Sequence, residues 1–230
     1  MGVRDAAMTA IARQLGHPSG LGGRLIGAAL NRGNRNLVRT AADALHAAEG
    51  SVVADVGFGG GVGLPLLLDA VGNSGHVHGV EVSETMINQA ARRHHRAIAA
   101  GRLVLHPASM TELPVADRAW DSLMTVNTIY FLADLDPALR ECTRVLTDTG
   151  RLVVGLADPE AMARLPFTAH GFRLRPVAEV VDAMKNIGLS VEHRRIADDE
   201  ESPHLLIGRV DADPHRGGQA RGPGARGPVR

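Results

Sequence analysis

The chain has 230 residues, which suffice for one sizeable α/β domain with attachments but not comfortably for two. It carries 25 Lys or Arg and 25 Asp or Glu residues, so its formal net charge of zero gives no reason to expect nucleic acid or an anionic membrane as the main partner. Cys142 is the only cysteine, which excludes an intrachain disulfide, and we find neither a leader nor a long apolar span in the sequence. These features predict a cytoplasmic protein.

Residues 1–49 are expected to form a helical segment. Apolar residues recur at helical spacing up to Gly16 and again from Leu37 to Gly50, and each pattern ends at its glycine. A stretch rich in Gly, Asn and Arg separates the two predicted helices. Its simplest interpretation is a loop with a capped start for the second helix.

Residues 51–63 predict a buried parallel strand that turns tightly into a helix. The apolar run ends at Asp55 and then breaks into glycines, with Pro65 in the first turn of the helix. Glycines let the backbone approach a bound molecule closely, and exposed amides at a helix start can receive an anion. The spacing is Asp-x-Gly-x-Gly-x-Gly, so the dinucleotide fingerprint Gly-x-Gly-x-x-Gly is not met. We expect a ligand site here, with a ligand-free tight turn as the alternative.

With this glycine loop, the sequence resembles the S-adenosylmethionine (SAM)-dependent methyltransferases of the Rossmann-like class. The resemblance implies that the loop formed by Gly57, Phe58, Gly59 and Gly61 wraps the methionine end of SAM, with Asp55 near its ammonium group. A carboxylate at the strand end suits a cationic amine, whereas it would repel a pyrophosphate. In this family a helical segment often precedes the loop, and residues 1–49 are similar to such a lid.

From residue 51 onward strands and helices alternate, which is typical of a parallel sheet covered on both faces. The predicted second strand, residues 76–82, ends with Glu81, 20 positions after Gly61. Glu81 could accept hydrogen bonds from both ribose hydroxyls, an arrangement shared by NAD and SAM folds. Val82 is the expected apolar floor beside the cofactor. The alternative for Glu81 is an exposed charge at a strand end.

Ser83 is predicted to cap a helix from residue 84 to about residue 100, and a third strand follows over residues 102–106. In the resembling family the next loop usually has an aspartate that binds the adenine amino group. Ser109 stands in its place, and a hydroxyl can still accept a hydrogen bond. Met110 could pack on the face of the purine.

The predicted fourth strand, residues 120–126, should open onto the same crevice, because ligands in open parallel sheets bind outside the carboxyl ends of the strands. Asn127 and Tyr130 are then the best placed side chains to face the methyl group and the nucleophile. Tyr130 as a packed core aromatic is the alternative. The tetrapeptide Asn-Thr-Ile-Tyr resembles the Asn-Pro-Pro-Tyr motif of methyltransferases that act on nucleic-acid amines, but it lacks both prolines.

Asp136 is expected to begin another helix, and the predicted fifth strand covers residues 151–156. Residues 157–175 then form the longest irregular stretch, where substrate specificity would be set beside the crevice. His170 is the only histidine in this stretch, and a neutral imidazole could take a proton from the nucleophile. A polar surface residue is the alternative interpretation.

A helix beginning at Pro176 and a closing hairpin of two strands, residues 190–196 and 204–210, complete the predicted domain. Residues 211–230 are rich in Gly, Pro and Arg with almost nothing to bury, and we expect them to be disordered.

We therefore predict a doubly wound, mostly parallel seven-stranded α/β sheet whose last strand is antiparallel. The expected organisation is a helical lid over residues 1–49, a SAM-binding domain over 50–210 and a tail over 211–230. The expected activity is methyl transfer from SAM to a small, apolar or aromatic acceptor by a monomer or homodimer that needs no metal and binds no nucleic acid. An NAD-dependent oxidoreductase and a catalytically inactive SAM-binding regulator are the alternatives.

Overall fold

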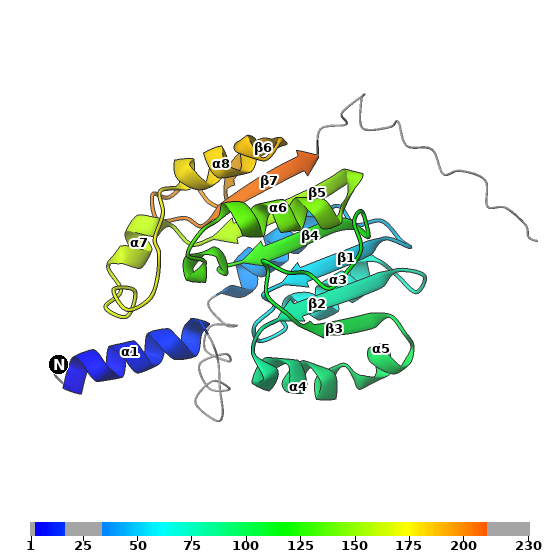
Figure 1. Cartoon of the computed structure of the whole chain (residues 1–230), viewed down its shortest axis with the longest axis horizontal. Helices are drawn as coiled ribbons and strands as arrows, with labels where there is room; N and C mark the ends of the chain where they lie inside the picture. Colours follow the sequence, from blue (N-terminus) through cyan, green and yellow to red (C-terminus); the bar gives the residue numbers. More distant parts are fainter. Residues whose placement is uncertain (1–2, 17–33, 211–230) are drawn as a thin grey trace, which may run out of the picture.

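The computed structural model describes residues 3–16 and 34–210, and their centre is one seven-stranded sheet (Figure 1). The strand order is β3-β2-β1-β4-β5-β7-β6, and β7 runs antiparallel to both of its neighbours. This confirms the predicted fold class, including the antiparallel last strand. The strands are β1 (Val52–Val56), β2 (His76–Glu81), β3 (Leu103–Pro107), β4 (Trp120–Val126), β5 (Leu146–Leu156), β6 (Leu189–Arg195) and β7 (His204–Val210).

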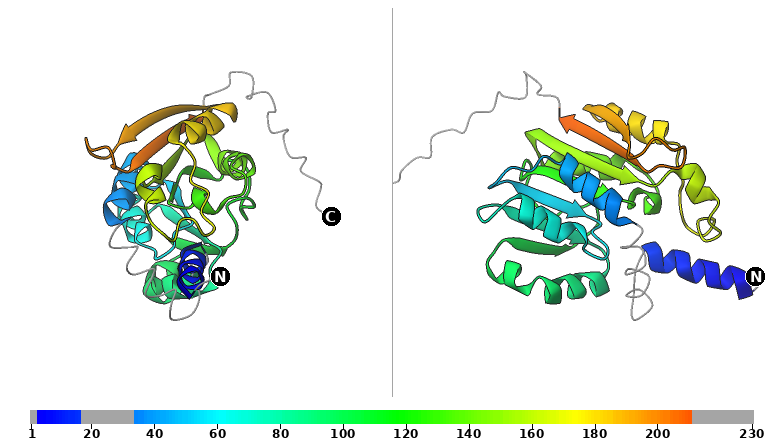
Figure 2. Two further views of the ribbon diagram at one scale, coloured as in Figure 1. Left: turned by 90° about the vertical axis from the view of Figure 1, so that its left-hand side faces the viewer. Right: turned by 180° about the vertical axis from the view of Figure 1, so that it is seen from behind.

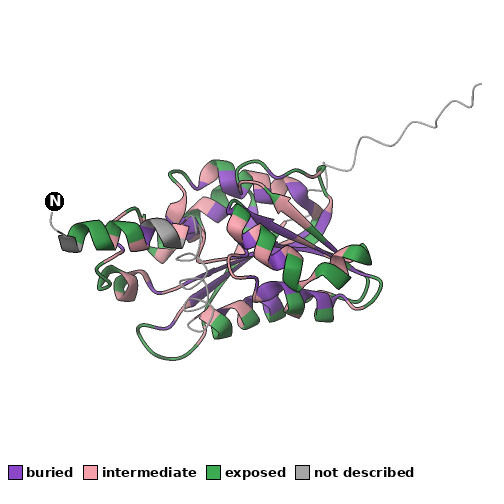
Figure 3. Cartoon of the chain, turned by 90° about the horizontal axis from the view of Figure 1, so that it is seen from below, coloured by how far each residue is buried: buried purple, intermediate pink, exposed green. Residues whose placement is uncertain are grey.

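Helices cover both faces of the sheet, and each face has its own apolar core. One core contains residues such as Leu139 and Met184, and the other contains residues such as Leu67 and Met86. Figure 3 shows the buried residues gathered on the strands and on the inward sides of the helices. The helices are α1 (Val3–Gly16), a helix over 34–44, α3 (Gly63–Ala70), α4 (Glu84–Arg93), α5 (His95–Ala99), α6 (Asp136–Val145), α7 (Pro159–Ala163) and α8 (Val177–Asn186), with a 3-10 turn at Ile129–Phe131.

The strand order places a topological switch in the middle of the sheet. The chain runs from β1 outward through β2 to β3 and then returns to the other side of β1 as β4. The connection after β1 leads toward β2, and the connection after β4 leads in the opposite direction, toward β5. A crevice therefore opens between the carboxyl ends of β1 and β4, which is where open α/β sheets bind ligands. The ends of β1, β2 and β4 are thus brought together, as the sequence predicted.

Three predicted elements differ from the structure. The helix expected over 84–100 is interrupted at His94, whose φ of −110° departs from helical geometry, so that it becomes α4 and α5. The stretch expected to be irregular contains α7, because Asp158 accepts the amide of Ala161 as N-cap and Pro159 occupies the first helical position. β5 begins at Leu146 instead of residue 151, with a register shift where it passes Trp120 of β4.

The N-terminal segment contains the two helices predicted for it. Figures 1 and 2 show α1 beside the loop that follows α7, and the side chain of Thr9 in α1 is 3.1 Å from Nδ1 of His170 in that loop. The stretch between the two helices and the predicted tail, residues 17–33 and 211–230, lie outside the described residues. Within the described ranges, no helix combines the length and the hydrophobicity that crossing a bilayer requires.

Candidate functional site

The loop after β1 has the tight geometry that its glycines predict. Gly57 has a φ of +75°, and its amide donates to the carbonyl of Val80 in β2 at 2.7 Å. A Cβ atom at Gly57 would lie 2.4 Å from Oγ1 of Thr128, which is far inside van der Waals contact. Gly59 and Gly61 also adopt positive φ values. The loop therefore requires glycine at Gly57 for two independent reasons, backbone conformation and space.

Glu81, at the end of β2, is fixed by the backbone on both carboxylate oxygens. Oε2 accepts the amide of Gly59 at 2.9 Å, and Oε1 accepts the amide of Ser83, also at 2.9 Å. Ser83 in turn caps α4 by accepting the amide of Met86, as predicted. Each carboxylate oxygen has a second lone pair, so Glu81 can still accept hydroxyl hydrogen bonds from a ligand.

Asp55, near the end of β1, is buried without a compensating partner among the described residues. Its carboxylate packs over the start of α3, where a Cβ atom at Gly63 would lie 2.2 Å from Oδ2. Among the residues that the structure describes, none donates a hydrogen bond to it. Burial, and next the charge of Glu81, raise the pKa of Asp55 from its usual 3.8 to about 7. A ligand cation placed here would satisfy a carboxylate that the described residues leave unpaired.

These residues open onto one cavity of about 430 Å³ at the carboxyl ends of the strands. It brings together ten of the twelve residues predicted for the site; Gly61 and His170 do not line it. The ten are Asp55, Gly57, Phe58, Gly59, Glu81, Val82, Ser109, Met110, Asn127 and Tyr130.

Asn127 and Tyr130 are tied to the end of β5. Oδ1 of Asn127 accepts the amide of Ala157 at 3.0 Å. The Tyr130 hydroxyl lies 3.1 Å from the same Oδ1 atom and 3.2 Å from the carbonyl oxygen of Ala157. Asn127 holds this position with a φ of +56°. Burial raises the pKa of the Tyr130 hydroxyl well above its usual 10, although a hydrogen bond with the Ala157 backbone opposes the shift. Tyr130 is therefore a neutral group at the cavity wall that also packs in the core.

Ser109 and Met110 lie at the opposite end of the cavity, in the connection between β3 and β4. Met110 is buried and presents an apolar surface. The Ser109 hydroxyl is 2.8 Å from the hydroxyl of Thr111 and accepts the Thr111 amide at 3.2 Å. It is thus committed to a local turn, and its predicted contact with adenine would use its remaining hydrogen-bonding capacity.

The other end of the cavity is aromatic, which the sequence did not reveal. The chain contains four Phe and one Tyr, and all five line this cavity. The ring of Phe172 lies 4.8 Å from Phe131, 5.7 Å from Phe167 and 5.9 Å from Tyr130, measured between centroids. Met162 and Leu165 extend the same apolar wall. The sequence predicted that Tyr130 faces the site and that the stretch after β5 borders it, but it did not place Phe131, Phe167 and Phe172 together in one wall.

His170 lies in that stretch without lining the cavity. Its recorded side-chain contact is with Thr9 of α1, and the ring is partly exposed. The C-terminal end of α1 approaches the cavity more closely, since Gly16 lines it and packs against the ring of Phe131. The structure therefore places His170 where α1 meets the aromatic wall, and its catalytic role stays a prediction.

A chain of polar side chains, buried at Asp158 and His204, anchors the start of α7 and was not predicted. Nε2 of His204 is 3.1 Å from Oδ2 of Asp158, and Nδ1 of His204 is 2.9 Å from Nε2 of His193. Burial alone would raise the pKa of Asp158, but the Ala161 amide and His204 together lower it. Ala157 and Met162 both line the cavity. Asp158 directly follows Ala157 and lies one helical turn before Met162, so the polar chain that holds Asp158 also fixes this wall of the cavity.

Known proteins match both the domain and the fold. Residues 54–154 match the family model described as a methyltransferase domain. A 37.1 kDa protein of transposon Tn4556 from Streptomyces fradiae is 36% identical over 120 residues, which cover 52% of this chain and 34% of that protein. The 27-O-demethylrifamycin SV methyltransferase of Amycolatopsis mediterranei is 29% identical over 172 residues, covering 74% of this chain and 61% of that protein. The matches to these two relatives thus span about a third and three fifths of the relatives' own lengths.

The fold is shared with solved methyltransferases. A SAM-dependent methyltransferase from Aquifex aeolicus superposes with a TM-score of 0.65 at 20% identity, covering 88% of this chain and 98% of that chain. The chemistry of the residues present fits SAM as a ligand: the Asp55 carboxylate, which has no partner among the described residues, suits an ammonium group, Glu81 can accept from hydroxyls, and the Met110 side chain suits the face of a purine. Residues 54–154 thus match a methyltransferase domain, and the fold around them is that of solved SAM-dependent methyltransferases.

Proposed function

We propose that the chain transfers a methyl group from SAM to a small acceptor whose reacting end is apolar or aromatic. The observation that carries the proposal is the composition of the cavity, which joins a polar, glycine-lined end to an aromatic end. Asp55 and Glu81 contribute two carboxylates at one end, and every Phe and Tyr of the chain contributes to the walls. A cationic nucleoside and an apolar acceptor would each find matching surface within one cavity.

The residues of the chain would act by placement. When bound, SAM supplies an activated methyl group on a sulfonium, so the reaction needs alignment more than it needs acid or base chemistry. Asp55 would hold the ammonium group and Glu81 the ribose, while the loop after β1 keeps the backbone close enough to enclose the amino-acid part. The aromatic wall around Phe172 would orient the acceptor and exclude water from the reacting atoms.

A direct test is transfer of a labelled methyl group from SAM into a metabolite extract, followed by identification of the labelled product. We expect labelling of apolar small molecules. Binding without any transfer would favour the inactive SAM-binding regulator. A thermal-shift comparison tests the remaining alternative: we expect S-adenosylhomocysteine to raise the melting temperature and NAD to leave it unchanged, because the unpaired carboxylate of Asp55 would repel a pyrophosphate.

Matched variants test the assigned cofactor contacts. Asp55→Ala and Glu81→Ala should each weaken S-adenosylhomocysteine binding by about 1–3 kcal/mol through lost charge-assisted hydrogen bonds. Glu84→Gln is the control, since Glu84 is exposed in the first turn of α4 and does not line the cavity. Unchanged calorimetric affinity in both alanine variants would show that the cofactor binds elsewhere. A cytoplasmic location and a monomeric or homodimeric state stay predictions from the sequence.

A further inference from the structure

The connection between β3 and β4, residues 108–119, forms the cavity wall at the predicted adenine end. Ala108, Ser109 and Met110 line the cavity, and Leu113 is buried a few residues further on. The connection contains no helix or strand, so its backbone groups have no regular ladder to bond with. A wall of this kind keeps its shape only if side chains elsewhere satisfy and hold its backbone.

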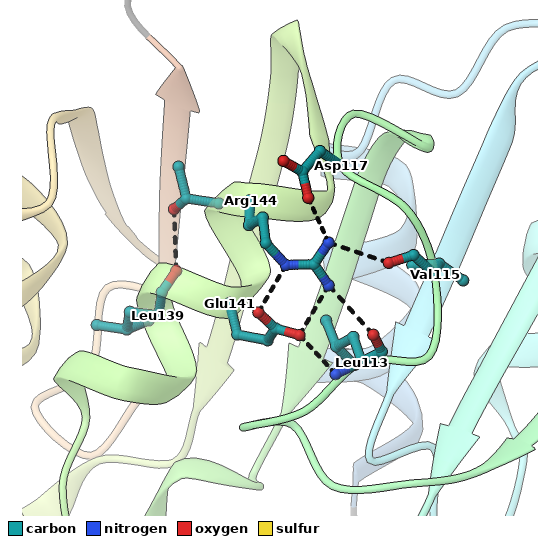
Figure 4. Close-up of polar contacts among 7 residues, drawn as sticks. Leu113, Val115, Asp117, Leu139, Glu141 and Arg144 are labelled. Carbon is teal, nitrogen blue, oxygen red and sulfur yellow. Dashed lines mark hydrogen bonds and ion pairs between the residues drawn. The ribbon is translucent and has the colours of Figure 1, made fainter.

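Arg144, near the end of α6, satisfies this backbone with its whole guanidinium group (Figure 4). Nε and Nη2 donate to the two carboxylate oxygens of Glu141, at 2.8 Å each. Nη2 also donates to the carbonyl of Leu113 at 3.1 Å, and Nη1 donates to the carbonyl of Val115 at 3.0 Å and to Oδ1 of Asp117 at 2.6 Å. All five N–H donors of the guanidinium therefore have acceptors, which a lysine could not reproduce.

Glu141 completes the contact from the same helix. Its Oε1 accepts the amide of Leu113 at 2.7 Å, so both backbone groups of Leu113 are held from α6. The side chains of Arg144 and Glu141 are 32% and 17% exposed, whereas Asp117 is 74% exposed. Exposed ion pairs contribute little, so the hold on the loop comes from the pair Arg144–Glu141 and its bonds to backbone atoms.

We propose that Arg144, held by Glu141, is a positioning residue that fixes the wall against which the adenine of SAM binds. The inference rests on the proposed function, because it takes SAM as the ligand. Arg144 does not line the cavity and acts through the loop that carries Ser109 and Met110. When the loop is ordered only part of the time, the apparent affinity falls by the fraction of molecules that are competent. The loss of affinity should come from the contacts with the adenine base, because the ribose and the amino-acid part of SAM would bind at the ends of β2 and β1.

The test is Arg144→Lys, with Arg140→Lys as the matched control one turn earlier on α6. Arg140 is exposed and pairs with Asp136 alone among the described residues. Calorimetry would measure the binding of S-adenosylhomocysteine and of S-inosylhomocysteine, which differ only at the base. We expect the wild type to prefer the adenine ligand. Arg144→Lys should weaken that ligand about tenfold, as expected if the ordered loop falls to about a tenth of the population. The inosine ligand lacks the amino group that the ordered loop would contact, so it should gain less from the ordered loop and lose less affinity, and the preference should fall.

A purely structural role would give a different pattern. If Arg144→Lys weakens both ligands equally, or leaves their ratio unchanged, the positioning role is wrong, and the same holds if Arg140→Lys has an equal effect. Should Arg144→Lys fail to fold, Glu141→Gln replaces it, since the amide oxygen can still accept the Leu113 amide; an unchanged ratio there also refutes the inference. A wild type that binds neither ligand would instead overturn the proposed function itself.

Discussion

The buried carboxylate of Asp55 should make the ligand-free protein less stable as the pH rises. Its pKa is about 7 in the folded protein and 3.8 when unperturbed, because burial and then Glu81 disfavour the charge. The folded protein therefore holds this proton more tightly than the unfolded chain, and stability is lost as the pH rises between these two values. Three pKa units correspond to about 4 kcal/mol at full ionisation. Asp55→Asn has nearly the same shape and cannot ionise, so it should remove this cost.

Urea unfolding without ligand, followed by circular dichroism, would measure the effect at pH 5 and pH 8.5. We expect Asp55→Asn to gain about 2–3 kcal/mol of unfolding free energy relative to the wild type between the two conditions, since part of the cost is already present at the lower pH. Asp69→Asn is the control for replacing an aspartate by asparagine, because Asp69 is exposed on α3. An equal difference for Asp55→Asn at both pH values would refute the reasoning.

Four further substitutions separate backbone, wall and surface roles. Gly57→Ala should abolish S-adenosylhomocysteine binding, because the new Cβ would lie 2.4 Å from the side chain of Thr128. Gly101→Ala is the control, since Gly101 has a similar φ of +70° but open space around it. This change should cost only about 1 kcal/mol of unfolding free energy and leave the binding unchanged. Tyr130→Phe should cost about 1 kcal/mol of unfolding free energy, and a much larger loss of methyl transfer in the labelling assay would show that the hydroxyl takes part in the reaction. His170→Ala tests the predicted catalytic role: a loss of methyl transfer of about a hundredfold would support that role, and a change within about threefold would contradict it.

The cofactor half of the site could be predicted because its constraints are local. Positive φ values, a close approach of two backbones and a carboxylate at a strand end each leave a direct trace in residue type, as at Gly57, Asp55 and Glu81. The N-cap pair Asp158-Pro159 left the same kind of trace, so α7 was predictable as well. The interruption at His94 left none, since the residues on either side have a continuous helical pattern.

The acceptor half could not be predicted because it exists only in the folded chain. Phe131 follows β4, whereas Phe167 and Phe172 follow α7, and nothing in their spacing says that they meet. A core aromatic and a cavity-lining aromatic are the same residue type in the same apolar context. Arg144 shows the same limit, because its pairing with Glu141 is visible as an i, i+3 spacing but its hold on the Leu113 carbonyl is not.

Ligand binding at the carboxylate of Asp55, at the end of one of two neighbouring strands, should depend on pH. Both oxygens of Glu81 accept backbone amides, whereas the described residues give Asp55 no donor and its pKa is about 7. A cationic amine bound at Asp55 must find the carboxylate ionised, so binding near neutral pH should release up to one proton. Calorimetry in buffers of different ionisation enthalpy would count it: S-adenosylhomocysteine, which carries the amine, should release more protons than adenosine, which lacks it, and its affinity should rise with pH from 6 to 8. Equal proton release for the two ligands would place the ammonium group away from Asp55.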